Sequence, residues 1–130
     1  MSLRTGRVGD LIAASVIESF GADVAIVNRE GYDLLVDWEG RWLKVEVKAT
    51  TAKEARRNCW TFRTASGSKA KKIIKAANVD IVALVSIPRR KVAFKHISQI
   101  KSVTTRVFEE KFQALDERES WDQACALLIK

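Results

Sequence analysis

The chain has few of the side chains that bind zinc or form disulfide bonds. It contains one histidine, His96, and two cysteines, Cys59 and Cys125, which lie far apart and form no Cys-x-x-Cys pair. This small number argues against a structural zinc site and excludes a disulfide framework. Two free thiols suit a reducing cytosol, so we expect a cytoplasmic protein.

Long apolar runs are also missing. The run Leu11–Ile17 is followed at once by Glu18, with no small-residue cleavage site, so it predicts a helix of the domain and not a signal peptide. No segment approaches the length that spans a membrane, and we expect no membrane association. The sequence shows no linker, repeat or low-complexity segment, which indicates one domain over residues 1–130.

The composition is that of a globular, basic protein. Hydrophobic residues make up 47% of the 130 residues, enough for a core that needs no metal or disulfide. Lysine and arginine number 23 against 16 acidic residues, a formal charge of +7. A surplus of this size fits a polyanionic partner such as nucleic acid, although solubility alone would also explain it.

Patterning along the chain predicts helices mixed with strands. An apolar helix over Asp10–Phe20 is closed by Gly21, a Lys-rich helix follows the turn residues within 66–78, and a helical tail covers about 105–130. Lys53–Asn58 reads as a loop or short helix. The predicted strands are Asp23–Asn28, Tyr32–Trp38, Trp42–Ala49, Cys59–Thr64, Asp80–Ile87 and Lys91–Phe94. This order predicts an α/β domain with a central mixed β-sheet flanked by helices.

The second and third predicted strands form a hairpin that brings two carboxylates together. Glu39-Gly40 fits a two-residue loop, because glycine supplies the positive φ of a primed turn. In that register Asp33 lies directly opposite Glu46, with Cβ atoms about 5 Å apart. Lys48 lies on the same face, two residues further along. A longer loop would shift this pairing.

Two opposed carboxylates destabilise a sheet unless a cation lies between them. Oxygen ligands without histidine or cysteine select Mg²⁺, or Mn²⁺ in its place, over zinc. A metal ion that polarises a phosphate and a lysine that positions a water molecule are the groups that phosphodiester hydrolysis needs. The competing interpretation is a hairpin whose outer face is merely charged.

These residues resemble the PD-(D/E)XK nuclease superfamily. Its motif is matched by Tyr32-Asp33, twelve residues, and then "EVK", with tyrosine in place of the motif's proline. The stretch "GRVGD", ten residues and Gly21 resembles the opening of archaeal Holliday-junction resolvases and of a group of intron-encoded homing endonucleases. The segment "WTFRT…NVDIVALVSIPRRKVAFKHI" is similar to the downstream half of the homing endonucleases. The resemblance covers residues 4 to 97, the expected core of a restriction-endonuclease-like fold.

The resemblance implies a role for each matched residue. Asp33 and Glu46 take the places of the two metal-binding acids, and Lys48 that of the catalytic lysine. The carbonyl of Val47 commonly completes such a metal site. Asp10 matches the acid of the first helix, which is usually glutamate in the family.

Glu18 competes with Asp10 for the role of the helix acid. The two residues are turned about 80° apart and lie about 12 Å apart along an ideal helix, so both cannot reach one metal. Asp10 is preferred, because its spacing to Gly21 matches the resembling families and because a helix start favours a carboxylate.

Taken together, these residues and the resemblance predict a metal-dependent DNA endonuclease, most similar to a homing endonuclease. A junction resolvase of the same superfamily and a non-catalytic nucleic-acid-binding module are the alternatives. Cutting both strands needs two active sites, so a homodimer or homotetramer is expected. His96 is expected to be structural, and Trp60 and Phe62 to lie in the core. The candidates for DNA contact are Arg4, Arg7, Arg56, Arg57, Arg63, Lys69, Lys71 and Lys72.

Overall fold

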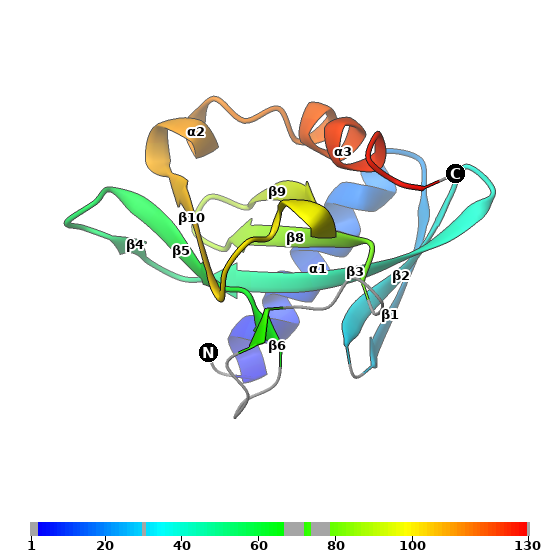
Figure 1. Ribbon diagram of the computed structural model, residues 1–130, viewed down its shortest axis with the longest axis horizontal. Coiled ribbons are helices and arrows are strands. Elements are labelled where there is room, and N and C mark those ends of the chain that lie inside the picture. Colours follow the sequence, from blue (N-terminus) through cyan, green and yellow to red (C-terminus); the bar gives the residue numbers. More distant parts are fainter. Residues whose placement is uncertain (1–2, 30, 67–71, 74–78, 130) are drawn as a thin grey trace.

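The computed structural model describes residues 3–29, 31–66, 72–73 and 79–129. A mixed α/β arrangement is seen, with three helices, a 3₁₀ turn and ten strands in the described ranges (Figure 1). The elements are α1 Leu3–Ser19, β1 Asp23–Arg29, β2 Tyr32–Trp38, β3 Arg41–Thr50, β4 Lys53–Glu54, β5 Cys59–Arg63, β6 Ala65–Ser66, β7 Lys72–Ile73, β8 Ile81–Ser86, β9 Lys91–His96, η1 Ile97–Gln99, β10 Thr104–Phe108, α2 Glu109–Gln113 and α3 Glu117–Cys125.

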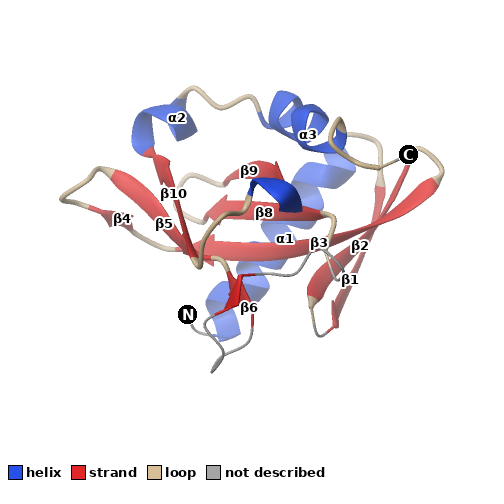
Figure 2. Cartoon of the chain, in the orientation of Figure 1, coloured by secondary structure: helices blue, strands red, loops and turns tan. Residues whose placement is uncertain are grey.

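The strands form one main sheet and two smaller ones. The main sheet has the order β1-β2-β3-β8-β9, in which only β3 and β8 run parallel. A small sheet has the order β10-β5-β4, and β6 pairs with β7. In Figure 2, α1 crosses behind the main sheet, and α3 lies along the β9 edge, where it packs into the same core cluster as α1. Helix α2 packs into a second cluster, on the other face. The predicted fold class, an α/β domain with a central mixed sheet flanked by helices, is confirmed.

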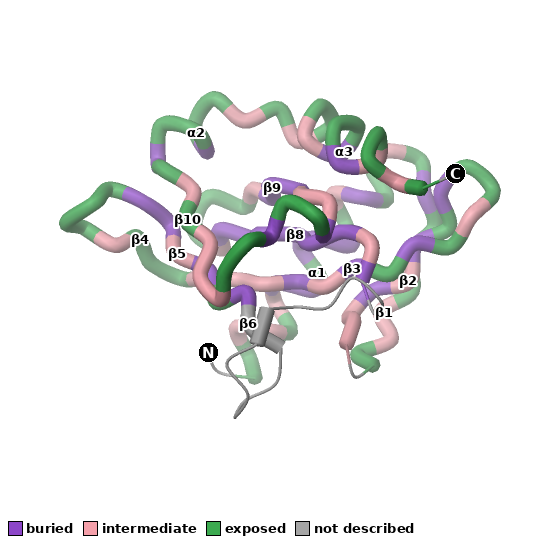
Figure 3. Tube along the Cα trace, viewed as in Figure 1, coloured by how far each residue is buried: buried purple, intermediate pink, exposed green. Residues whose placement is uncertain are grey.

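The two faces of the main sheet are covered by different elements, and β8 is buried on both (Figure 3). Ile81, Ala83 and Val85 pack with α1 and α3 in the first core cluster. Val82 and Leu84 pack into a second cluster with β5, η1 and α2. A strand covered on both faces needs a nearly continuous apolar sequence, as this one has.

The β2–β3 hairpin has the predicted turn and register. Glu39 and Gly40 both take positive φ, 49° and 81°, as a primed two-residue turn requires. Trp38 pairs with Arg41, and the ladder continues in step to Leu34 and Val45. It ends there, one pair before the expected backbone pairing of Asp33 with Glu46.

The first residue of β2 departs from the predicted face. Regular alternation along β2 would place Tyr32 on the same face as Leu34, but Tyr32 packs against the second core cluster, on the other side of the sheet. The Lys44 ammonium lies 5.6 Å from the centre of the Tyr32 ring. The face therefore changes where the β2–β3 ladder ends.

Helix α1 begins seven residues before the predicted start at Asp10. Gly6 and Gly9 lower the local helix propensity, and the predicted helix did not extend over them. The structure supplies the reason for Gly9: a Cβ atom there would lie 2.6 Å from the Cβ of Ala49 on β3. Asp10 is consequently in the middle of the helix, so the expected stabilisation by the positive end of the helix dipole does not apply.

Two other helix predictions are wrong in part. The tail expected to be helical from about 105 contains strand β10, which pairs with β5, before α2 and α3 begin. Within the Lys-rich helix predicted over 66–78, Ser66 and Lys72 pair as strands. The rest of that prediction lies outside the described residues. The predicted loop or short helix after Lys53 begins as strand β4.

The edge strand β9 is closed by side chains of α3. The amide of Val92 donates to Glu117 Oε2 at 2.8 Å, and the amide of Phe94 donates to Ser120 Oγ at 2.6 Å. Trp121 of the same helix is fully buried, with its ring 5.1 Å from that of Phe94. The outward backbone groups of this edge are thus paired within the chain.

Both cysteines are free thiols, Cys59 buried and Cys125 half-buried. None of the helices in the described ranges combines the length and apolar character that crossing a membrane requires.

Candidate active site

Asp33 contacts β3 through its side chain at the point where the β2–β3 ladder ends. The amide of Val47 donates to Asp33 Oδ2 at 2.8 Å. The carboxylate therefore takes the place of a backbone acceptor on β2. Since the N–H and C=O of one strand residue point to the same side, the Val47 carbonyl also faces the side on which Asp33 lies. Two of the expected metal ligands share this edge of β3.

Glu46 and Lys48 lie on the β3 face opposite Val45 and Val47. The Lys48 ammonium lies 3.8 Å from Glu46 Oε1, and their side chains are 22% and 15% exposed. Glu46 is also hydrogen-bonded to the side chain of Asp33. The structure therefore brings Asp33, Glu46 and Lys48 together in a half-buried position, as the hairpin register predicted.

Asp10 reaches this group from α1. It is buried, with 7% of its surface exposed. The pKa of Asp10 is raised to about 7, mainly by burial and further by repulsion from Asp33, while Arg7 opposes the shift. Glu18, the competing candidate, is exposed on the same helix. Of the two helix acids, Asp10 is the one that interacts with the hairpin carboxylates.

The crowding of the three carboxyl groups raises the pKa of the buried Glu46. Its pKa is raised to about 9, mainly by burial and further by the hydrogen bond and charge of Asp33 and the charge of Asp10, while Lys48 opposes the shift. At neutral pH a proton held by Glu46 therefore relieves the crowding of negative charge. A bound cation would have the same effect.

The chemistry of the donors fits a hard divalent cation. All candidate ligands are oxygens: two carboxylates and a backbone carbonyl on one edge of β3. Among the residues that the structure describes, no three acidic, histidine or cysteine side chains converge closely enough to form a complete metal site by themselves. Mg²⁺ is commonly bound in this way, by one or two carboxylates together with water and substrate phosphates.

The candidates for DNA contact are mostly exposed. Exposed side chains are found at Arg4, Arg7, Arg56, Arg57 and Arg63. Arg7 lies close enough to Asp10 to lower its pKa, and Arg57 pairs with Glu54 at 3.5 Å. Lys69 and Lys71 lie outside the described residues, and of Lys72 only the backbone is described, in β7.

His96 stabilises the 3₁₀ turn η1. It caps this turn, where its Nδ1 accepts the amide of Ser98 at 3.1 Å. Trp60 and Phe62 lie in the second core cluster, as predicted.

Sequence reasoning missed several residues that position the site and its surroundings. Gly9 allows α1 to approach β3 closely. The presence of a glycine inside a helix was the signal that could have revealed this contact. Arg106 lies on β10 beside β5, where alternation in "TTRVF" could have indicated a strand. The buried Glu109 binds Arg89 and Lys53, a grouping that nothing local in the sequence reveals.

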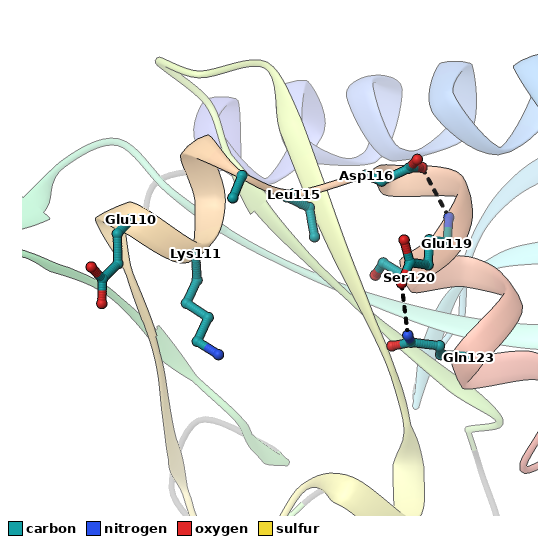
Figure 4. A pocket seen from close by; sticks show the side chains of 8 residues that line it. Glu110, Lys111, Leu115, Asp116, Glu119, Ser120 and Gln123 are labelled. Carbon is teal, nitrogen blue, oxygen red and sulfur yellow. Dashed lines mark hydrogen bonds between the residues drawn. The ribbon is translucent and has the colours of Figure 1, made fainter.

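A separate hollow of about 460 Å³ lies between α2 and α3, and Figure 4 shows the side chains around it. Its polar groups are largely paired with one another: Asp116 caps α3 by accepting the Glu119 amide, and Gln123 donates to Glu119 Oε1. None of the carboxylates of the candidate active site lines it. The segment 109–122 holds six acidic and two basic residues, which makes this side of the molecule unfavourable for a polyanion.

Comparison with known proteins finds a likeness of fold. No family model matches the chain, and no curated protein matches it either. A solved structure that matches is that of a bacterial homing endonuclease, I-Ssp6803I, with a TM-score of 0.65 and 17% sequence identity. The match covers 93% of this chain and 85% of the other. At this identity the likeness establishes a shared fold.

Proposed function

We propose that this chain is a Mg²⁺-dependent DNA endonuclease of the PD-(D/E)XK type, in which Mn²⁺ can replace Mg²⁺. The observation that carries the proposal is the Asp33–Glu46 carboxyl pair, held at one edge of β3 by the Val47 amide, with Lys48 beside it. The likeness of the fold to a homing endonuclease supports the same conclusion. The basic charge of +7 is suited to DNA.

Each residue of the site has a task in this proposal. Asp33, Glu46 and the Val47 carbonyl would hold the cation. When bound, the cation polarises the scissile phosphate and lowers the pKa of a water molecule. Lys48 donates hydrogen bonds that orient this water for attack and balances the charge that develops on the phosphate.

Asp10 is assigned to act through water. Because no three acidic side chains of the described chain converge on one point, Asp33 and Glu46 are the direct carboxylate ligands in this proposal. The buried Asp10 carboxyl accepts a hydrogen bond from a water molecule of the site and restricts its position. This role depends on the helix approach that Gly9 permits.

A homodimer or homotetramer is proposed as the active form. One subunit offers one carboxyl pair, whereas cleavage of both strands of a duplex needs two. Light scattering on the purified protein, with and without DNA, measures this state directly.

The function is tested by cleavage of a supercoiled plasmid and a synthetic four-way junction side by side, with Mg²⁺ and with chelator. We expect Mg²⁺-dependent cleavage of the plasmid, reduced at least a hundredfold in Asp33→Asn and Glu46→Gln. Glu18→Gln is the matched control, because it removes a negative charge from an exposed position. Both active-site variants keep an oxygen that can accept the same hydrogen bonds, so their folding should be retained and is checked by thermal melting.

Three results would change the conclusion. Strong preference for the junction over linear duplex of the same sequence would favour the resolvase alternative. DNA binding without cleavage at any metal concentration would favour the non-catalytic binding module. Wild-type cleavage rates in Asp33→Asn or Glu46→Gln would show that the active site lies elsewhere.

A further inference from the structure

The small sheet has one buried face and a second face that carries polar side chains, except at the end where Cys59 pairs with Phe108. Thr61 pairs with Arg106, and Arg63 pairs with Thr104. Since directly paired residues point to the same side, these four side chains share a face. Glu54 joins them, because Thr61 Oγ1 donates to Glu54 Oε2 at 3.2 Å. We refer to these five residues as the outer face.

The opposite face of the small sheet is occupied by the core. Trp60 and Phe62, which alternate with the outer-face residues of β5, are 3% and 1% exposed. Arg63 and Arg106 of the outer face are both exposed. The apolar side of the small sheet is therefore buried in the core, and the arginines of its polar side are accessible to a partner.

The outer face is basic, because its two arginines and the neighbouring Arg57 outnumber its one acid. Glu54 lies 3.5 Å from the Nε of Arg57 and 4.0 Å from the Nε of Arg106. The two arginine side chains remain 57% and 42% exposed. A guanidinium held through Nε keeps its outer N–H groups available for a second acceptor. Arg63 adds a third positive charge on the same side.

The dimensions of the outer face match those of a DNA groove. Strands β5 and β10 have five residues each, which corresponds to about 17 Å, or about five base pairs at 3.4 Å per step. Neighbouring strands lie about 4.8 Å apart. The major groove, about 12 Å wide, admits a two-stranded β-ribbon, and its base edges are contacted by arginine and threonine.

A buried ionic joint fixes the small sheet against the main sheet. Glu109, 4% exposed, accepts from Arg89 at 2.8 Å and lies 2.9 Å from the Lys53 ammonium. Lys53 belongs to β4 of the small sheet, and Arg89 to the turn that joins β8 and β9. Hydrogen bonds from these two cations lower the pKa of Glu109 to about 2, so the joint stays charged at physiological pH.

The joint is close in sequence to the proposed catalytic lysine. Strand β3 leads into β4 after two residues, so only five positions separate Lys48 from Lys53. The outer face is therefore held in a fixed relation to the candidate active site. The acidic α2–α3 side of Figure 4 lies on other elements and would repel a polyanion.

We propose that the outer face enters the major groove of duplex DNA beside the cleaved phosphate and reads base edges through Arg63 and Arg106. Glu54 is a positioning residue that holds Arg106 and Arg57 in the orientation for this contact. The inference rests on the proposed nuclease function and adds to it the element that determines sequence preference.

The test is selection of bound sequences from a randomised 30-base-pair duplex library in the presence of chelator. We expect the wild type to select a defined sequence, and Arg63→Ala or Arg106→Ala to lose about tenfold or more of the discrimination at one or two positions. Arg118→Ala is the control, because Arg118 is an exposed arginine on α3, away from the outer face, and its contacts are with Asp122, Phe20 and Trp38. It should select the wild-type sequence. Thermal melting confirms that each variant is folded.

Glu54→Gln distinguishes base reading from simple charge attraction. It removes the negative charge but keeps an acceptor for Thr61. If the arginines read bases, this variant should bind random duplex at least as tightly as the wild type yet discriminate less. If the face binds phosphates alone, Arg63→Ala and Arg106→Ala should weaken binding uniformly with unchanged preference, and this result would overturn the inference.

The same experiment separates the inference from the proposed function. A wild type that cuts plasmid with Mg²⁺ but selects no sequence would leave the nuclease in place and exclude base reading by the outer face. Unchanged selection in all variants would exclude it as well. Failure of the wild type to cut or bind any DNA would remove the nuclease function on which the inference rests.

Discussion

The pH dependence of stability in metal-free protein should report directly on the crowding of charge at Glu46. The folded state holds a proton on this residue up to about pH 9, whereas the unfolded chain releases it near pH 4.5. Between these values the folded state binds more protons than the unfolded state. The free energy of unfolding should therefore fall as the pH rises through this window.

The magnitude follows from the size of the window. One proton held only by the folded state lowers stability by about 1.4 kcal/mol per pH unit. From pH 6 to pH 8, Glu46 alone should cost about 2.7 kcal/mol by this relation. For a domain of this size, that loss corresponds to a fall in melting temperature of roughly 10 °C. Asp10, whose pKa is raised to about 7, adds a loss in the lower part of the range.

Glu46→Gln isolates the effect, because glutamine imitates the protonated side chain and cannot lose a proton. Urea unfolding in chelator at pH 6, 7 and 8 should show the stability of the variant rising relative to wild type by about 2.7 kcal/mol between pH 6 and pH 8, in addition to the difference already present at pH 6. Saturating Mg²⁺ should flatten the wild-type curve, because a cation compensates the carboxylates. Glu18→Gln, at an exposed position, should follow the wild type throughout.

Parallel curves for wild type and Glu46→Gln in chelator would refute this reasoning. They would mean that Glu46 is not held in its protonated form, and the case for a cation at the carboxyl pair would lose its electrostatic basis. A stability that rises with pH in the wild type, and not in the variant, would contradict the sign of the effect.

Three further predictions concern the surroundings of the pair. Lys48→Ala should lose cleavage rate but keep DNA binding, whose logarithm should fall linearly with the logarithm of salt concentration in a filter-binding assay; a large loss of affinity would assign Lys48 to binding. Asp10→Asn should slow single-turnover cleavage more than tenfold and Glu18→Gln should change it little, and the reverse order would exchange their roles. Gly9→Ala should destabilise the fold by about 1–3 kcal/mol in urea unfolding, because the new methyl group meets Ala49, and Ala49→Gly should restore much of the loss; no effect would mean that the helix moves freely.

The proximity of Asp33, Glu46 and Lys48 was largely predictable because it depends on one local feature. The turn at Glu39-Gly40 determines the register of the hairpin, and the register determines which side chains approach Glu46. The detail that escaped prediction is the hydrogen bond from Val47 to Asp33, which replaces a backbone pair. Alternation assumes that a ladder continues, and it carries no information on where two strands stop pairing.

The remaining errors come from contacts between segments that are distant in the sequence. Gly9 lowers helix propensity locally. A glycine is nevertheless needed at this helix position, because a larger side chain would collide with Ala49 of β3. Strand β10 is short and is followed at once by α2, so its pairing with β5 decides its structure. Local patterns also could not reveal that Glu109 is buried, because an acidic residue in a polar segment is expected to be exposed. Its burial depends on Lys53 and Arg89, which come from distant parts of the chain.

The closure of β9 by α3 limits how copies of this chain could assemble. Chains that join by extending a common sheet need an edge strand with unpaired amides, and the amides of Val92 and Phe94 are already bound to Glu117 and Ser120. Of the two edges of the main sheet, only β1 keeps its outer side uncovered by such contacts in the described structure. A subunit interface built on sheet continuation would therefore pass through Asp23–Arg29, and one built on side-chain packing would leave both edges as they are.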